Sequence, residues 1–217
     1  MSLTLQAALR AALVQAGTAA DTAHDLAHAE RVWHLSAAIA GEEGVPAGPV
    51  LMAAAYLHDL VSLPKDHPDR ALASRHSAQA AGPVLRALGF SDTDCDACAH
   101  AIEAHSFSAG IEPVSIEAKI LRDADRLEAL GAIGLARCFA VSGALGRALF
   151  DGADPFAKGR TLDDRSFAVD HFAVKLLTLP DTMLTAAGRR LAHARAGVLR
   201  SYLDQLAEEL GVDPSGW

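Results

Sequence analysis

Apolar residues along much of the chain recur at steps of three and four, which is the spacing of one face of an α-helix. Residues 3–16 carry leucine and alanine at these steps and end before Gly17, which predicts an amphipathic helix with a glycine cap. The run VLMAAAYL at 50–57 has no polar face and predicts a helix that is buried on all sides. This helix would present His58 and Asp59 at its C-terminal end.

Capping residues, glycines and prolines mark the ends of the remaining helices. The predicted ranges are 22–41, 71–88 with a kink or break at Gly82-Pro83, 92–105, 116–127, 166–178 and 182–210. Residues 151–165 mix glycine, proline and aspartate and indicate a long excursion between helices. No strand alternation or internal repeat stands out. The pattern therefore predicts a compact, all-α fold of roughly eight helices.

The composition also favours closely packed helices over sheet. The chain is 51% hydrophobic but only 5% aromatic, and alanine, the strongest helix former, supplies much of this apolar mass. Its 217 residues are enough to bury one substantial core. We therefore expect a single domain over 1–217, with the functional residues within 22–130 and the C-terminal helices of 131–217 completing the fold.

Charge and hydropathy exclude some classes of partner. A formal net charge of −8 argues against a nucleic-acid partner, because neutralising a phosphate backbone needs clustered lysine and arginine. A small anionic substrate stays compatible with a locally positive site. No apolar run approaches the roughly 20 residues that span a bilayer, and the N-terminal segment lacks a basic region before an apolar core. We expect no membrane association and a cytoplasmic location.

The three cysteines do not describe a disulfide scaffold. Cys95 and Cys98 form a C-x-x-C pair, with Cys138 as the third cysteine. Without a second pair, a redox or zinc role is weaker than the alternative of small, half-buried residues on a helix.

The His58-Asp59 pair carries the first sign of chemistry. Chance alone accounts for about one such dipeptide in a chain of this composition, and a second one occurs at His24-Asp25. The position of His58-Asp59 at the end of an apolar helix matters more, because a carboxylate buried beside an imidazole needs a cation or a partner to compensate it. His28 on a second helix and Asp125 on a third could add a nitrogen and an oxygen. This set suits a divalent ion with open positions for water and substrate.

Five ordered segments resemble a known family. These are HDLAHAERV at 24–32, AAYLHDLV at 54–61, LPKDHPDRALAS at 63–74, LRDADRLEALGAIGLAR at 121–137, and DHFAVKLLTLPDTMLTAAGRRLA at 170–192. Together they resemble the HD-domain metal-dependent phosphohydrolases, in particular their small stand-alone bacterial members. The resemblance covers nearly the whole chain and implies an HD-domain fold.

The resemblance also implies the metal ligands. The family's ligands fall on His28, His58, Asp59 and Asp125, which would hold Mn, Fe, Co, Ni, Mg or Zn. Asp123 is the alternative to Asp125. It lies two residues away and hence on a different helix face, so both carboxylates cannot point at one ion.

Basic residues around these ligands are candidates for holding phosphate oxygens. They are Arg31, one turn beyond His28, Lys65 and Arg70 in the loop after the His-Asp pair, and Lys175 in the C-terminal half. Each could instead be a solvated or structurally paired charge. For the catalytic role we expect Asp59 to orient water, with Lys65 and His105 as further candidates.

The resulting hypothesis is metal-dependent hydrolysis of a phosphate ester or phosphoanhydride. The resemblance implies a small phosphorylated substrate, most simply a nucleotide, with pyrophosphate release from a nucleoside triphosphate as one form of the reaction. It also allows a homodimer. The alternatives are a non-catalytic metal- or nucleotide-binding HD module, and another HD chemistry, such as a cyclic-nucleotide phosphodiesterase or an oxygenase, for which His24, His100 and His105 offer further ligands.

Overall fold

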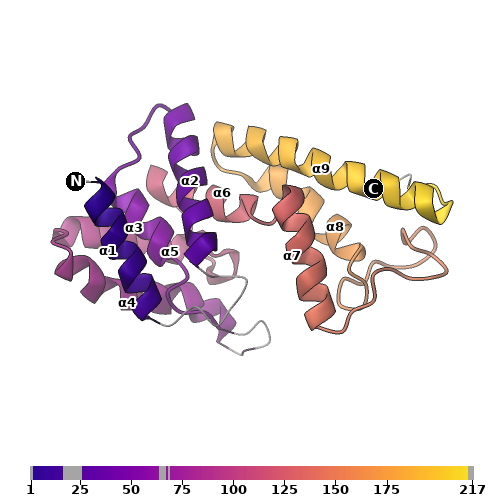
Figure 1. Ribbon diagram of the computed structural model, residues 1–217, viewed down its shortest axis with the longest axis horizontal. Helices are drawn as coiled ribbons and strands as arrows, with labels where there is room; N and C mark the ends of the chain where they lie inside the picture. Colours follow the sequence, from indigo (N-terminus) through magenta and orange to yellow (C-terminus); the bar gives the residue numbers. More distant parts are fainter. Residues whose placement is uncertain (1, 17–25, 64–66, 68, 215–217) are drawn as a thin grey trace. The chain divides into compact units, whose positions relative to one another are not determined.

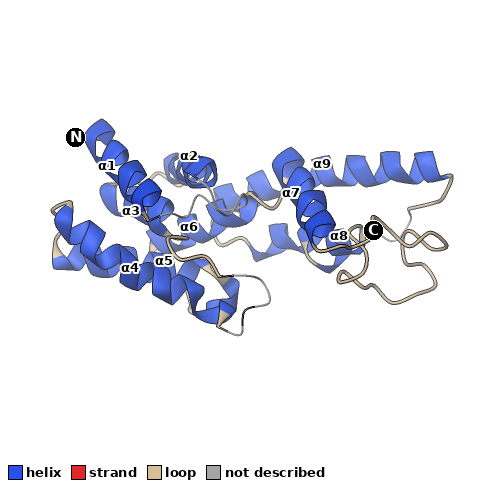
Figure 2. Cartoon of the chain, turned by 60° about the horizontal axis from the view of Figure 1, so that its bottom comes forward, coloured by secondary structure: helices blue, strands red, loops and turns tan. Residues whose placement is uncertain are grey.

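A computed structural model describes residues 2–16, 26–63, 67 and 69–214 (Figure 1). The predicted helix start near Thr22, His24 and Lys65 fall outside these ranges. Figure 2 shows helices joined by loops, and within the described residues the only strand-like pairing is an isolated bridge between Ala148 and Phe167. The predicted all-α fold is confirmed.

The contacts within the chain group it into two compact units, residues 1–125 and 126–217. The expectation of a single domain over 1–217 stays a prediction. Within the described part of the chain, no single helix is long and apolar enough to cross a membrane, and one bent pair, α6 (Ile116–Leu127) with α7 (Gly131–Ala144), meets those limits by length and composition alone.

The first unit is built around the buried helix predicted at 50–57. Its helices are α1 (Ser2–Gln15), α2 (Leu26–Glu42), α3 (Pro49–Leu57), α4 (Ala73–Ala87), α5 (Asp92–His105) and most of α6 (Ile116–Leu127), with the short 3-10 turns η2 (Arg70–Leu72) and η3 (Phe107–Ala109). α3 contacts α1, α2, α4 and α5, and all of Leu51–Leu57 is buried. An apolar helix of this kind can be surrounded on every side without burying unpaired polar groups. Its C-terminal end, and with it His58, is therefore fixed inside the unit.

Helix α4 corrects one prediction. It runs from Ala73 to Ala87 with Pro83 inside, so of the kink or break predicted at Gly82-Pro83 the break is absent and the kink stays a prediction. Proline removes the hydrogen bond to the carbonyl four residues earlier, which here belongs to Gln79. Both Pro83 and Gln79 are exposed, so water can satisfy this carbonyl and the helix continues.

The second unit contains α7 (Gly131–Ala144), α8 (Asp170–Val174), the 3-10 helix η4 (Leu176–Thr182) and α9 (Ala186–Leu210). α9 contacts α7 and η4. The rings of Phe139 in α7, Phe172 in α8 and Tyr202 in α9 lie with their centroids 5.6 to 6.0 Å apart. Such aromatic groupings add stability beyond the area they bury.

Two predicted helices of this unit differ from the structure. The segment predicted as one helix at 166–178 begins instead with turns around an isolated bridge residue, Phe167. There Ala168 donates its N–H to the Ala148 carbonyl, and the Ser166 carbonyl accepts from the Ala148 N–H. Only α8 and η4 are helical there. The last helix begins at Ala186 rather than 182, because Thr185 accepts a hydrogen bond from the Gly188 N–H and caps it.

Two glycines allow the tight turn between α6 and α7. Gly131 has a φ of +69°, which L-residues with a side chain rarely adopt. A Cβ on Gly134 would lie 2.2 Å from the backbone of Ala129. Gly131 is therefore required by its backbone conformation, and Gly134 by the close approach of the Ala129 backbone.

Candidate metal centre

Histidine and aspartate side chains from α2, α3 and α6 converge where α3 ends. The Nε2 atoms of His28 and His58 lie 3.2 Å apart. Asp125 Oδ1 lies 3.5 Å from the Nε2 of His28 and 3.9 Å from that of His58. The two histidines are each 1% exposed, whereas the Asp125 side chain is 31% exposed. The group is therefore anchored in the core and reachable from one side.

Asp59 joins this group to a fifth residue, His105. Its Oδ2 lies 3.4 Å from His58 Nε2 and 3.9 Å from His28 Nε2. Its other oxygen, Oδ1, lies 3.7 Å from His105 Nε2. One carboxylate thus faces the two buried histidines with one oxygen and a third imidazole with the other.

Hydrogen bonds to the backbone set the tautomers of two rings. His58 Nδ1 lies 2.9 Å from the carbonyl oxygen of Ala55, and His105 Nδ1 lies 2.6 Å from that of Ile102. A carbonyl only accepts, so each Nδ1 carries the proton and, in the neutral ring, each Nε2 presents a lone pair. A histidine that binds a metal through one ring nitrogen usually donates the N–H of the other nitrogen to such an acceptor, which fixes the orientation of the ring.

The charges of the site favour the protonation states that bind a metal. Burial lowers the pKa of His105, and the nearby His58 adds to this effect. Burial by itself raises the pKa of Asp125, but His58, His105 and His28 together outweigh it and the net pKa is lowered. A neutral imidazole and an ionised carboxylate are the forms in which these side chains coordinate cations.

The donor atoms of His28, His58 and Asp125 lie close enough together to bind one divalent ion. Bonds of about 2.0–2.2 Å from a metal to nitrogen and oxygen place the ligands of one ion no more than about 4 Å apart. The pairs above span 3.2 to 3.9 Å. In the described residues, His28, His58 and Asp125 form one group able to hold an ion, and His58, Asp59 and His105 form a second, overlapping one. Mixed imidazole and carboxylate donors suit borderline first-row metals.

The other predicted residues fall in different places. Asp123 is fully buried in α6 and belongs to neither group. Arg31 lies half-buried on α2. Arg70, in η2, donates a hydrogen bond to the carbonyl of Leu63. Lys175 is an exposed residue of the second unit, and its predicted role in substrate binding, like those of Arg31, Arg70 and the undescribed Lys65, stays a prediction.

The C-x-x-C pair shows no feature of a reactive site. Cys95 and Cys98 are both buried as free thiols in α5. Burial raises the pKa of Cys98 to about 12, with a further contribution from Cys95. A thiol with so high a pKa is neither a good nucleophile nor a ready metal ligand, which favours the structural role.

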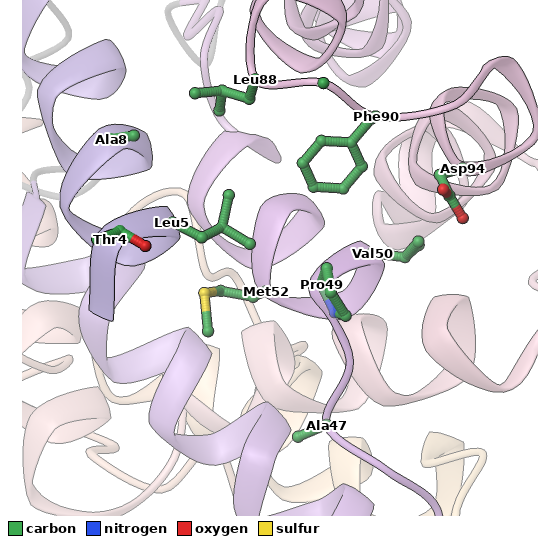
Figure 3. Close-up of a pocket in the computed structure, with 11 residues that line it drawn as sticks. Thr4, Leu5, Ala8, Ala47, Pro49, Val50, Met52, Leu88, Phe90 and Asp94 are labelled. Carbon is green, nitrogen blue, oxygen red and sulfur yellow. The ribbon is translucent and has the colours of Figure 1, made fainter. Parts of the chain in front are cut away.

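An apolar cavity of about 600 Å³ lies at the other end of α3 (Figure 3). Leu5 of α1, Met52 of α3 and Phe90, which follows α4, are among the residues that line it. Pro49, at this end of α3, is nine residues from His58, or about 13 Å along the helix at 1.5 Å per residue. The cavity is therefore separate from the histidine and aspartate cluster.

Comparison with known proteins agrees with this architecture. The HD domain family matches residues 25–130. The uncharacterized protein YpgQ of Bacillus subtilis is 34% identical over 191 residues, which cover 86% of this chain and 84% of YpgQ. The crystal structure of YpgQ in complex with ADP gives a TM-score of 0.73 at 30% identity over 95% of both chains. An HD-superfamily hydrolase from Bacillus thuringiensis gives 0.71 at 28% identity over 96% of this chain and 100% of that one.

These similarities confirm the resemblance seen in the sequence. The matched range of 25–130 contains all five residues of the cluster, and the likeness to YpgQ extends through most of both proteins. The chain therefore belongs to the HD-domain family.

Proposed function

We propose that the protein is a metal-dependent phosphohydrolase that acts on a nucleotide. The observation that carries the proposal is the convergence of His28, His58, Asp59 and Asp125, with nitrogen and oxygen atoms 3.2 to 3.9 Å apart. In this proposal the four residues hold one divalent ion, and the preference among Mn, Fe, Co, Ni, Mg and Zn is open because the donors suit several of them.

A divalent ion held there supplies Lewis-acid activation of water and of a phosphoryl oxygen. Asp59 orients the attacking water through its carboxylate. His105 lies with Nε2 3.7 Å from Asp59 Oδ1, and in the neutral ring that atom can accept a proton and return it to the leaving oxygen. The negative charge of the phosphates is proposed to be neutralised by Arg31, Lys65, Arg70 and Lys175. A chain with a net negative charge needs such a local group of cations to bind a phosphorylated substrate.

The nucleotide part of the proposal has support from one relative. The similar protein YpgQ was crystallised in complex with ADP. The specific reaction we propose is the hydrolysis of a nucleoside triphosphate with release of pyrophosphate. We also retain a cytoplasmic location and a homodimer as parts of this proposal.

A substrate panel tests the reaction. Protein loaded in turn with Mn, Co, Ni, Mg and Zn should release phosphate or pyrophosphate from at least one nucleoside triphosphate or other phosphoester, as measured by colorimetric phosphate detection with and without pyrophosphatase. No turnover with any metal would overturn the enzyme proposal and favour the non-catalytic binding module.

Metal content distinguishes the two aspartates of α6. Asp125→Ala should lower the affinity for the ion, because it removes an oxygen that lies 3.5 Å from His28 Nε2. The loss should be at least about 10- to 100-fold, which is the effect of removing a residue that only hydrogen-bonds to a metal ligand. Asp123→Asn should retain the metal. The measurement is metal per chain by mass spectrometry after dialysis against a weak chelator. Loss of metal from Asp123→Asn, with retention by Asp125→Ala, would transfer the ligand role to Asp123.

The overlapping second group favours one further candidate, a two-metal phosphodiesterase. Asp59 Oδ1 and His105 Nε2, 3.7 Å apart, could hold a second ion, with Asp59 shared between the two ions through its other oxygen. His58 overlaps the two groups, but its one Nε2 lone pair binds a single ion. Two-ion sites place their metals about 3.5–4 Å apart and stabilise both the attacking and the leaving oxygen. A content of two metals per chain, together with hydrolysis of cyclic nucleotides, would support this candidate over the first.

A further inference from the structure

We infer that Ser77 is a positioning residue, which sets the place of Asp59 in the metal cluster. It acts through the backbone of Val61, two residues after Asp59. The inference rests on the proposed function, because it is there that Asp59 serves as a ligand of the ion.

Asp59 lies where the helices themselves fix the chain least. His28 lies within α2 and Asp125 lies within α6. By contrast, α3 ends at Leu57, and Asp59 lies in the turn that follows. Each residue outside a helix keeps two soft dihedral angles, whereas a binding site needs its groups held to within about 0.5 Å. A contact beyond the end of α3 is therefore needed to fix this carboxylate.

The Ser77 hydroxyl provides such a contact by bonding both backbone polar groups of one residue. The Val61 N–H donates to Ser77 Oγ over 3.0 Å, and Ser77 Oγ donates to the Val61 carbonyl over 3.3 Å. A hydroxyl both donates and accepts, so it can make the two bonds at once. The Cα atoms of Asp59 and Val61 lie no more than about 7 Å apart along the chain. The hydroxyl therefore holds the backbone directly after Asp59.

The packing of helix α4 keeps Ser77 itself in place. Its side chain is fully buried, and α4 contacts both α3 and α5. One turn earlier, on the same face of α4, the buried Ser74 donates a hydrogen bond of 3.1 Å to the carbonyl of Glu103 in α5. The helix that carries Ser77 is thus joined to its neighbours by packing and by a hydrogen bond.

Packing alone would favour alanine over serine at position 77. Alanine forms helices more readily than serine, and a buried hydroxyl costs free energy unless it is hydrogen-bonded. Ala78 and Ala81 fill other buried positions of the same helix. The two bonds to the Val61 backbone give the hydroxyl of Ser77 a role that alanine could not fill.

Metal affinity compares the loss of this hydroxyl with the loss of another. Ser77→Ala should weaken Mn binding about 10-fold, the lower end of the range for losing a contact that orients a metal ligand. The measurement is the electron paramagnetic resonance signal of free Mn during a titration. Val61 is half-buried, so water can replace the hydroxyl at its backbone and the variant should fold.

Ser91→Ala is the matched control. It removes a serine hydroxyl that accepts a hydrogen bond from the backbone N–H of Asp94, at the start of α5 and about 20 Å along that helix from His105. Losing this cap should lower the Tm by about 2–4 °C, comparable to the effect of Ser77→Ala. The Mn affinity of the control should equal that of the wild type.

Two further measurements separate positioning from a general loss of stability. In metal-free protein, the Val61 amide hydrogen should exchange with solvent faster in Ser77→Ala than in Ser91→Ala, as measured by nuclear magnetic resonance. Added to Asp59→Asn, Ser77→Ala should weaken Mn binding by less than about twofold, because two residues that act through one another are not additive. Added to Asp125→Ala, it should weaken Mn binding by its full effect.

The outcomes test the inference and the proposed function separately. Equal Mn affinity in Ser77→Ala and Ser91→Ala would overturn the positioning role, even if the wild type hydrolyses nucleotides. A selective loss of affinity in Ser77→Ala would support the role even if the wild type hydrolyses nothing, in which case the catalytic proposal fails alone. A Val61 amide that exchanges freely in the wild type, or a wild type that binds no Mn, would also overturn the inference.

Discussion

Replacing Asp59 with asparagine should lower the rate of substrate hydrolysis by about a hundred- to a thousandfold, the scale on which loss of one group that stabilises a transition state acts. Asparagine keeps the shape of the side chain but removes its negative charge. Asp59 faces His28 and His58 with one oxygen and His105 with the other, so the change weakens the proposed metal site and the orientation of water together. No other residue of the cluster combines these two positions.

The measurement is kcat/KM for the best substrate found in the panel, at saturating metal. Asp92→Asn serves as the control, because the Asp92 side chain is 94% exposed and lies at the start of α5, the helix that ends in His105. Circular dichroism should show equal helix content in both variants. Near-wild-type turnover by Asp59→Asn would refute the role assigned to this carboxylate.

The sequence predicts the elements whose formation depends on local pattern. The apolar run at 50–57 gave α3 nearly to the residue, because no polar face offered an alternative to full burial. The cap at Ser91 likewise places the start of α5 at Asp92. The helix predicted at 166–178 fails for the opposite reason. Its first residues pair with Ala148, about twenty positions earlier in the chain, and periodicity carries no information on such a partner.

In the site, too, some features depend on the local sequence and others on the packing of distant segments. The family resemblance pointed to its residues, but the shared position of Asp59 between two sets of imidazoles depends on the packing of several helices. The tautomers could have been predicted locally. His58 and His105 each bond the carbonyl three residues earlier, and both stand at helix ends, where such carbonyls lack a helical partner.

Replacing Arg160 with alanine should lower the free energy of unfolding by about 3 kcal/mol or more, the cost of leaving a buried carboxylate without its partner. Asp170 is fully buried. Its two oxygens accept hydrogen bonds of 2.5 and 2.7 Å from the Arg160 guanidinium, and a third of 2.6 Å comes from the Asp163 N–H. The same guanidinium lies 4.6 Å from the ring of Phe167. This single side chain therefore fastens the long excursion between α7 and α8 to the start of α8.

Urea denaturation followed by circular dichroism measures the effect. Lys158→Ala is the matched control. The Lys158 nitrogen lies 2.9 Å from the Asp213 carboxylate, but the two side chains are 45% and 67% exposed. Pairs exposed to that degree contribute about 0–1 kcal/mol, so the control should unfold close to the wild type. Adding Asp170→Asn to Arg160→Ala should recover part of the loss, because it removes the uncompensated charge. If Arg160→Ala is no more destabilising than Lys158→Ala, water reaches Asp170 and the pair does not hold the loop.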